Sequence, residues 1–164
     1  MESSENLNLS SFLFPLFPRF PHMVVKVSCV LTGETFGADV EIMEKVKNNK
    51  RPRLHVVEAP PEGSNFMIVF CPISFCVGSD VESAMKDDRV LSSDTPVILV
   101  LMHHTRDVDY SAEGTKWSEV YKNVVLDVRV LFHETKPGLL KCKQNDEAIK
   151  AIQQVLCSYK ERLF

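Results

Sequence analysis

The sequence has no excess of positive charge, and this limits the partners that it can bind. Its 19 lysine and arginine residues are outnumbered by 22 aspartate and glutamate residues, so the net charge is −3. Proteins that bind the phosphate backbone of nucleic acids use clustered positive charge to displace counterions. We therefore expect no nucleic-acid partner.

A long uninterrupted apolar run is also missing. The longest run, residues 66–77, contains Pro72 and is shorter than the roughly 20 residues that a membrane-spanning helix requires. The apolar stretch at residues 12–18 is interrupted by proline and follows Glu2 and Glu5, whereas a secretory signal has a basic start and a continuous apolar segment. These features predict a soluble protein of the cytoplasm that does not enter a membrane.

Glycine is scarce, and the glycine-rich phosphate loops are absent. The chain has six glycines and contains neither GxGxxG nor GxxxxGK[ST], which argues against a dinucleotide-binding loop or a P-loop.

Cysteine is present in an odd number, and most of the cysteines lie within apolar runs. They are Cys29, Cys71, Cys76, Cys142 and Cys157. This pattern predicts reduced thiols packed in a core, as in a cytosolic protein.

The composition that remains is that of a globular protein. The chain is 45% hydrophobic and 25% charged, and its 164 residues correspond to about one domain. Residues 1–22 differ from the rest, because Pro15, Pro18 and Pro21 recur at every third position and forbid a helix. We expect a loosely ordered leader over residues 1–22 and a single domain over residues 23–164. An aromatic peptide motif for a partner is the alternative interpretation of the leader.

Strand-like and helix-like segments alternate from Met23 onward. Strands are predicted at residues 24–31, 54–58, 66–73, 97–102 and 124–132, and helices at residues 38–48, 79–88 and from the cap residue Asn145 to the C-terminus. The unbroken apolar runs at 66–73 and 97–102 are typical of central strands, whereas the alternation after residue 124 is typical of an edge strand. The pattern predicts an α/β fold. We expect a three-layer flavodoxin-like sandwich, with helices on both faces of a five-stranded parallel sheet of order 2-1-3-4-5 and strands two and five outermost.

Ligands of such a sheet bind beyond the carboxyl ends of the strands, next to the point where the strand order reverses. Three loops therefore carry the candidate ligand-binding residues, which are Thr32, Gly33, Thr35, Ser74, Gly78, Ser79, His103 and Asp107. His133 and Glu134 are expected at the same edge of the sheet, one strand further out.

The first of these loops, Thr32-Gly33-Glu34-Thr35, resembles the Thr-Gly-x-Thr phosphate loop of flavodoxins, which implies bound FMN. Small hydroxyl residues and the N–H groups of a helix N-terminus suit a phosphate. However, Glu34 places a negative charge beside that anion, and aromatic residues to sandwich a flavin are not evident in the sequence. A strand-to-helix turn that uses Gly33 for its backbone freedom is the alternative interpretation.

The second loop leads into residues 78–84, Gly-Ser-Asp-Val-Glu-Ser-Ala. This string resembles the small-Gly-Ser/Thr-x-x-Glu pattern of nucleoside deoxyribosyltransferases and related N-glycosidases, and TIR domains place a glutamate-bearing helix after a corresponding strand. The resemblance implies that Glu82 is catalytic at the sugar C1, where a carboxylate can attack or stabilise a cationic carbon. Ser79-x-x-Glu82 also fits a capping box, which forms without any catalysis.

Histidine and cysteine provide further candidates at this edge. His103 and His104 are consecutive at a strand end, so their side chains should point to opposite faces. Cys71 and Cys76 with one of these histidines form a conceivable zinc set, but Cys-x4-Cys is not a typical structural-zinc spacing. Nothing in the sequence marks Cys76 as an activated nucleophile paired with a histidine. We therefore assign no metal and no cofactor.

Four short strings carry a resemblance to a group of small vertebrate cytosolic α/β proteins. The strings are residues 70–73 (FCPI), 96–100 (PVILV), 103–105 (HHT) and 131–134 (LFHE). The resemblance extends from about Met23 to the C-terminus. The resemblance implies one compact domain and does not imply any particular activity.

No matched acid, base and nucleophile occur in the predicted loops, which favours a non-enzymatic cytosolic binding or signalling module. Its contact patch would be formed by Ile73, Phe75 and Val77. A nucleoside or nucleotide N-glycosidase that uses Glu82 is the alternative, followed by an FMN protein. A protein partner or a nucleoside or nucleotide ligand fits these hypotheses. The predicted edge strand at 124–132 either pairs with another chain or is protected by Asp127 and Arg129, so the sequence leaves the oligomeric state open.

Overall fold

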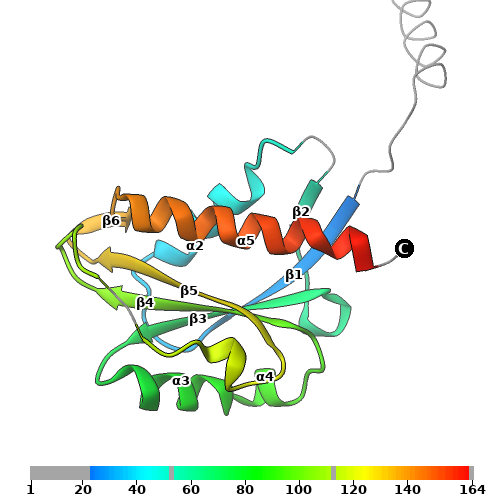
Figure 1. Cartoon of the computed structure of the whole chain (residues 1–164), viewed down its shortest axis with the longest axis horizontal. Helices are drawn as coiled ribbons and strands as arrows, with labels where there is room; N and C mark the ends of the chain where they lie inside the picture. The colour runs from blue at the N-terminus through cyan, green and yellow to red at the C-terminus, as the bar shows by residue number, and fades with distance from the viewer. Residues whose placement is uncertain (1–22, 52–53, 112–113, 163–164) are drawn as a thin grey trace, which may run out of the picture.

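A six-stranded sheet forms the centre of the computed structural model, which describes residues 23–51, 54–111 and 114–162 (Figure 1). The strand order is β2-β1-β3-β4-β5-β6. The first five strands along the chain are parallel, and β6 runs antiparallel to β5. The bounds are β1 Met23–Leu31, β2 Leu54–Glu58, β3 Phe66–Ile73, β4 Val97–His104, β5 Val124–His133 and β6 Lys136–Leu139. The predicted α/β class and the order of the five parallel strands are confirmed, and the predicted leader lies outside the described residues.

Helices cover both faces of the sheet (Figure 1). Helices α2 (Ala38–Lys47) and α5 (Lys143–Arg162) pack on one face, where Ile42 and Ile152 join a core with Phe66, Phe70 and Phe132. Helices α3 (Val77–Met85) and α4 (Asp88–Leu91) cover the other face together with the 3₁₀ turn η3 (Trp117–Glu119). A second 3₁₀ turn, η2 (Pro61–Gly63), precedes β3. No helix in the described part of the chain is both long enough and apolar enough to span a membrane.

The helix predicted at residues 79–88 is confirmed as α3 over residues 79–85, but it ends three residues earlier than predicted and a second short helix follows. Helix α3 ends at Met85, and α4 begins after Asp87, whose side chain accepts a hydrogen bond from the N–H of Arg89. An aspartate in this position satisfies an N–H group that has no partner within the helix, so it favours a new helix start. The chain therefore turns between α3 and α4.

The predicted five-stranded sheet is also wrong, since β6 adds a sixth strand. The sequence of β6 is Lys-Pro-Gly-Leu, and it pairs with β5 only at Phe132 and His133. Proline and glycine both argue against a strand in a sequence, which is why the pattern did not predict one here. As a result, β5 is not outermost over its last residues.

Asn145 does not cap the C-terminal helix as predicted, because α5 already begins at Lys143. The Asn145 side chain is buried. Its Oδ1 accepts a hydrogen bond from the N–H of Leu131 at 2.7 Å, and its Nδ2 donates to the carbonyls of Leu131 at 2.9 Å and Leu140 at 2.7 Å. Asn145 thus joins the first turn of α5 to the edge of β5.

Candidate functional site

The loop after β1 packs directly on the end of β3. The Thr32 hydroxyl donates to the carbonyl of Phe70 at 3.1 Å, and a Cβ added to Gly33 would lie 3.3 Å from Cγ of Pro72. Thr35 is buried, and its hydroxyl donates to the Asp39 carboxylate. The predicted ligand residues Thr32, Gly33 and Thr35 therefore all have structural contacts within the protein, and phosphate binding by them stays a prediction.

The loop after β3 is organised by Asp80 and not by the predicted capping box. Asp80 Oδ2 accepts hydrogen bonds from the N–H groups of Ser74 at 2.8 Å and Phe75 at 3.0 Å. Because α3 begins at Val77, Ser79 lies inside the first turn, where its hydroxyl is 2.9 Å from Sγ of Cys76. The predicted capping box is wrong. The Asp80 side chain accepts the hydrogen bonds of the loop, and the Glu82 carboxylate pairs with Lys86 and not with the N–H of Ser79.

Glu82 lies on the exposed side of α3 and forms an ion pair with Lys86 at 2.7 Å. The hydrogen bond from Lys86 lowers the pKa of the Glu82 carboxyl. A hollow of about 310 Å³ beside Glu82 is lined by residues of α3 and α4 and by Ser93, Tyr121 and Asn123. The three predicted ligand loops contribute nothing to this hollow, so it does not bring Glu82 together with Thr32 or His103.

The consecutive histidines at the end of β4 differ in exposure. The His103 ring is buried, lies 5.6 Å from the ring of Tyr110, and has no hydrogen-bond partner at Nε2 within the part of the chain that the structure describes. Burial lowers the pKa of His103, and the positive charge of Arg129 lowers it further. His104 is exposed and stacks on His133 at 4.5 Å. Asp107 follows in a turn in which its Oδ1 accepts from the N–H of Asp109 at 3.0 Å.

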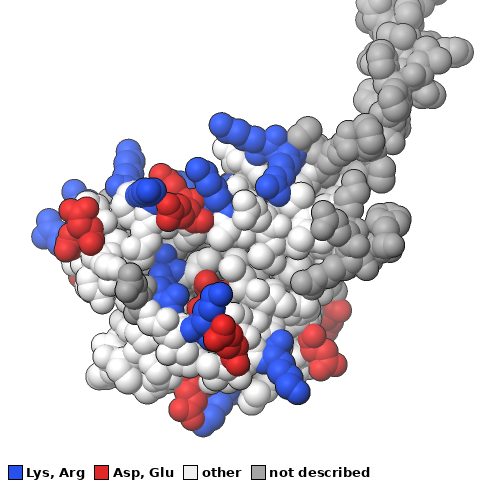
Figure 2. Space-filling model, in the orientation of Figure 1, with Lys and Arg blue, Asp and Glu red and all other residues white. Residues whose placement is uncertain are grey.

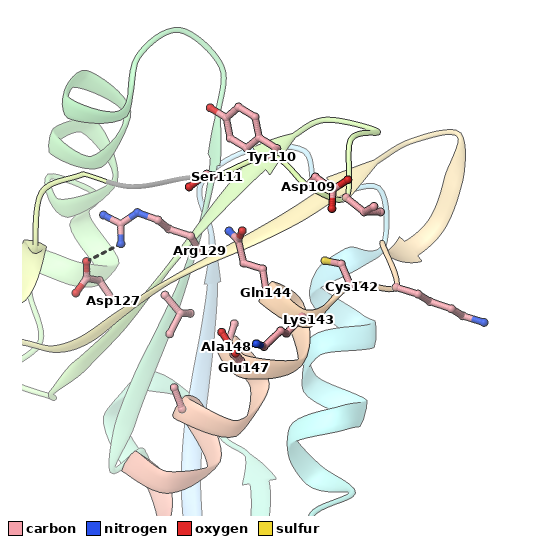
Figure 3. Close-up of a pocket in the computed structure, with 14 residues that line it drawn as sticks. Asp109, Tyr110, Ser111, Asp127, Arg129, Cys142, Lys143, Gln144, Glu147 and Ala148 are labelled. Carbon is pink, nitrogen blue, oxygen red and sulfur yellow. Dashed lines mark hydrogen bonds and ion pairs between the residues drawn. The ribbon is translucent and has the colours of Figure 1, made fainter.

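A groove of about 730 Å³ lies along the edge of β5 (Figure 3). Residues 127–129 of β5 line it from the sheet, residues 108–111 from the loop after β4, and residues 141–144, Glu147, Ala148 and Ala151 from the start of α5. Figure 3 shows Tyr110 and Ser111 on the loop side of the groove and Gln144 and Glu147 on the helix side. The edge of β5 is therefore recessed between two walls.

The backbone of β5 offers hydrogen-bonding groups to this groove. The N–H and C=O of one residue in a parallel strand point to the same side, and this side alternates along the strand. Leu131 directs both groups toward Asn145, whereas the carbonyl of Phe132 accepts from Thr105 at the end of β4. The same alternation directs the N–H and C=O of Asp127 and Arg129 into the groove. No strand of the described residues pairs with this side of β5 ahead of Phe132.

Asp127 and Arg129 also fix the loop that leads into η3. Arg129 Nη2 donates to the carbonyl of Thr115 at 2.6 Å, and Nη1 lies 3.5 Å from Asp127 Oδ2 (Figure 3). Asp127 Oδ2 accepts from the N–H of Trp117 at 3.2 Å. These two side chains are mostly buried, so they shape the floor of the groove and do not cover its open backbone groups.

A second hollow, of about 610 Å³, adjoins the groove through residues 141–143 and Glu147. Its lining contains four lysines but only two carboxylates, namely Lys45, Lys141, Lys143, Lys150, Asp146 and Glu147. Figure 2 shows lysine and arginine side chains along this side of the molecule, with aspartate and glutamate side chains between them. The excess of lysine lies in this adjoining hollow, where Lys143 is 3.8 Å from Glu147, whereas acidic and basic residues are balanced in the lining of the groove itself.

The conceivable zinc set of Cys71, Cys76 and a histidine, to which we assign no metal, is not among the groups that the described residues bring together. Cys71 is buried with its Sγ 3.5 Å from the carbonyl of Asp80, whereas Cys76 is exposed. Within residues 23–51, 54–111 and 114–162, the one group of histidine, cysteine and acidic residues close enough to hold an ion is His104, His133 and Glu134. The prediction that His133 and Glu134 lie at the same edge as the β4 histidines is confirmed.

The cysteines should differ strongly in reactivity. Burial, with the nearby Glu58 carboxylate, raises the pKa of Cys29 to about 12, and burial raises the pKa of Cys71 to about 11. The hydrogen bond with Ser79 lowers the pKa of the exposed Cys76. Since the thiolate is the reactive form, iodoacetamide at neutral pH should label Cys76 well before Cys29 or Cys71, as measured by peptide mass spectrometry.

A Ser79→Ala variant tests the cause of the faster labelling of Cys76. It removes the hydrogen bond to Cys76 and should slow the labelling of that cysteine alone. Equal rates for Cys76 and Cys71 in the parent chain would contradict the described placement of these thiols.

Comparison with known proteins adds no assignment to this geometry: no protein-family model matches the chain, and no curated protein matches it.

The sequence did not indicate the groove residues Tyr110, Lys141 and Gln144. The alternating pattern of β5 was the available signal, since it marks a strand whose outer backbone groups need a partner.

Proposed function

We propose that the chain is a non-enzymatic cytosolic binding or signalling module with a flavodoxin-like fold, and that it binds an extended acidic segment of a partner protein. The segment would add as a strand to the free edge of β5. The observation that carries this proposal is the pair of residues Asp127 and Arg129, whose backbone N–H and C=O groups face the groove with no strand partner among the described residues. A single bound strand would supply these missing hydrogen bonds.

The recessed position of the edge favours a peptide over a second copy of the chain. The β5 edge lies between the loop at 108–111 and the first turns of α5. A narrow extended segment can enter between these walls. The β5 strand of a second copy is recessed between identical walls, so the two edges would be held apart.

The lysines beside the groove favour acidic side chains on the partner. The adjoining hollow has two more lysines than carboxylates. Carboxylates of a bound strand would reach the ammonium groups of Lys141 and Lys143 at this end. Complementary charge of this kind mainly increases the rate of association and the specificity of a complex.

The flavodoxin-like fold and the cytosolic location are supported by separate observations. The parallel strands keep the order 2-1-3-4-5 with helices on both faces, which is the flavodoxin-like arrangement. All five cysteines are free, as expected in a reducing compartment.

Fluorescence anisotropy with a labelled peptide of alternating valine and glutamate tests this proposal. The full chain should bind this peptide, and it should bind an alternating valine and lysine peptide at least tenfold more weakly, a difference of about 1.4 kcal/mol. N-methylation of every second peptide residue removes the backbone N–H donors from one side of the peptide strand. Two such peptides can be made, one methylated at the odd and one at the even positions, and the one whose methyl groups face β5 should not bind. Equal binding of the methylated and unmethylated peptides would show that no strand is added.

Charge reversal in the protein separates the groove from nonspecific attraction. The double variant Lys141→Glu and Lys143→Glu should weaken binding of the acidic peptide by about tenfold or more. The double variant Lys26→Glu and Lys86→Glu is the matched control, since it makes the same change in charge at two exposed lysines that line neither the groove nor the adjoining hollow. A similar loss in both variants would assign the attraction to the overall charge of the chain, and would contradict a site in the groove.

The alternatives from the sequence, an N-glycosidase that uses Glu82 and an FMN protein, stay predictions. The hollow beside Glu82, at about 310 Å³, lies at the lower end of the ~300–1,000 Å³ typical of ligand pockets. Glu82 is exposed and bound to Lys86, whereas the groove combines a larger volume with open backbone groups. The binding module is therefore the function that the geometry supports best.

A further inference from the structure

Two imidazoles and a carboxylate come together where β4 and β5 end. His104 is the last residue of β4, His133 is the last residue of β5, and Glu134 follows directly. Parallel pairing places His104 opposite Phe132, so His133 and Glu134 are the next residues beside it. The arrangement is therefore a consequence of strand register, and it lies at the edge of the sheet where folds of this type bind ligands.

The donor atoms of the three residues are close to one another. His104 Nε2 contacts Glu134 Oε2, and His133 Nδ1 lies 3.6 Å from the same oxygen. One donor atom from each residue lies within 4.8 Å of the others. Ligands that share one zinc ion at about 2.0–2.2 Å are separated from each other by roughly 3.3 Å. Binding of all three donors to one ion would require side-chain rotations that turn the two stacked rings toward a common point.

Neighbouring groups hold the two imidazoles in place. The His133 and His104 rings are stacked with an interplanar angle of 25°, and the edge of Phe132 supports His104 at 5.5 Å. Thr135 binds Nδ1 of His133 through its hydroxyl at 2.8 Å and through its N–H at 3.2 Å. Both Thr135 contacts are made to Nδ1, the nitrogen that lies 3.6 Å from Glu134, so a zinc ion at Nδ1 would replace them. The stacking and the Phe132 edge would remain as the contacts that orient the rings.

We propose that His104, His133 and Glu134 bind a divalent transition-metal ion, with zinc as the representative ion. Two histidines and one carboxylate are a ligand set that zinc accepts, and three protein ligands leave at least one coordination position open. His104 and Glu134 are exposed, so the open position would face solvent and could take water or a carboxylate from a partner. This site is separate from the β5 groove and does not rest on the proposed function.

Isothermal titration calorimetry of the full chain with Zn²⁺ tests this site. Cys76 is exposed and could bind zinc itself, so every protein in the series carries Cys76→Ser. We expect one ion per chain in this background. His104→Gln and Glu134→Gln should each weaken binding by at least tenfold, since loss of even a supporting contact of a metal ligand costs about 10–100-fold in affinity.

His55→Gln is the matched control, because His55 is an exposed histidine on β2; it should leave zinc affinity unchanged. A second measurement is amide hydrogen exchange over residues 133–139, which Zn²⁺ should slow in the Cys76→Ser chain and not in its Glu134→Gln variant. Thermal unfolding without metal establishes that each variant is folded. Absence of zinc binding, or binding that survives both substitutions unchanged, would overturn the proposal.

Discussion

Replacing Asn145 with alanine should lower the free energy of unfolding by about 2–4 kcal/mol. The side chain is buried and satisfies the N–H of Leu131 and the carbonyls of Leu131 and Leu140. Its removal leaves these backbone groups without their partner in a region closed to water, where each unsatisfied group is costly. Urea denaturation followed by circular dichroism measures the change.

Two further variants make this result specific. Gln154→Ala replaces an exposed residue of the same helix and should change stability by less than about 0.5 kcal/mol. Asn145→Asp keeps the acceptor for Leu131 but turns a carboxylate toward two carbonyl oxygens, so at neutral pH it should destabilise at least as much as alanine does. A loss below 1 kcal/mol for Asn145→Ala would mean that water replaces the side chain.

The second large effect is expected for Phe132→Ala, with a loss of about 3–5 kcal/mol in the free energy of unfolding. The Phe132 side chain is fully buried in the core under α5, and its ring supports His104. Truncation removes apolar contacts and leaves a cavity that the surrounding strands can fill only in part. The same denaturation experiment provides the measurement.

Phe75→Ala is the matched control for Phe132→Ala. The Phe75 side chain is 92% exposed in the loop before α3, so its truncation should change stability by less than about 0.5 kcal/mol. Similar losses for the two variants would contradict the different burial of these two phenylalanines.

The order of the parallel strands could be predicted because the apolar pattern of the chain depends directly on burial. Residues 66–71 and 97–103 are buried throughout, as their unbroken apolar runs indicated. Strand β6 could not be predicted, since its proline and glycine are tolerated only because it pairs with two residues of β5. Its existence depends on tertiary position and not on local propensity.

The candidate sites also include features that could be predicted from the sequence and features that could not. His133 and Glu134 could be placed beside the β4 histidines because strand register determines their position. The groove could not be predicted, because its walls come from the loop at 108–111 and the start of α5, which meet only after the sheet has formed. Ser79 and Glu82 matched a capping pattern, but α3 begins at Val77, before Ser79, and Glu82 pairs with Lys86.

The placement of the first strand and the last helix has a practical consequence for labelling. Strand β1 begins, and α5 ends, on the side of the molecule opposite β6 (Figure 1). The Tyr159 hydroxyl accepts a hydrogen bond from Nδ2 of Asn65 at 2.8 Å and anchors the end of α5 there. The start of β1 and the end of α5 therefore lie far from the carboxyl ends of β4 and β5 (Figure 1). A dye on the exposed Cys76, in the loop between β3 and α3, would then be separated from a dye at the end of α5 by the length of the sheet.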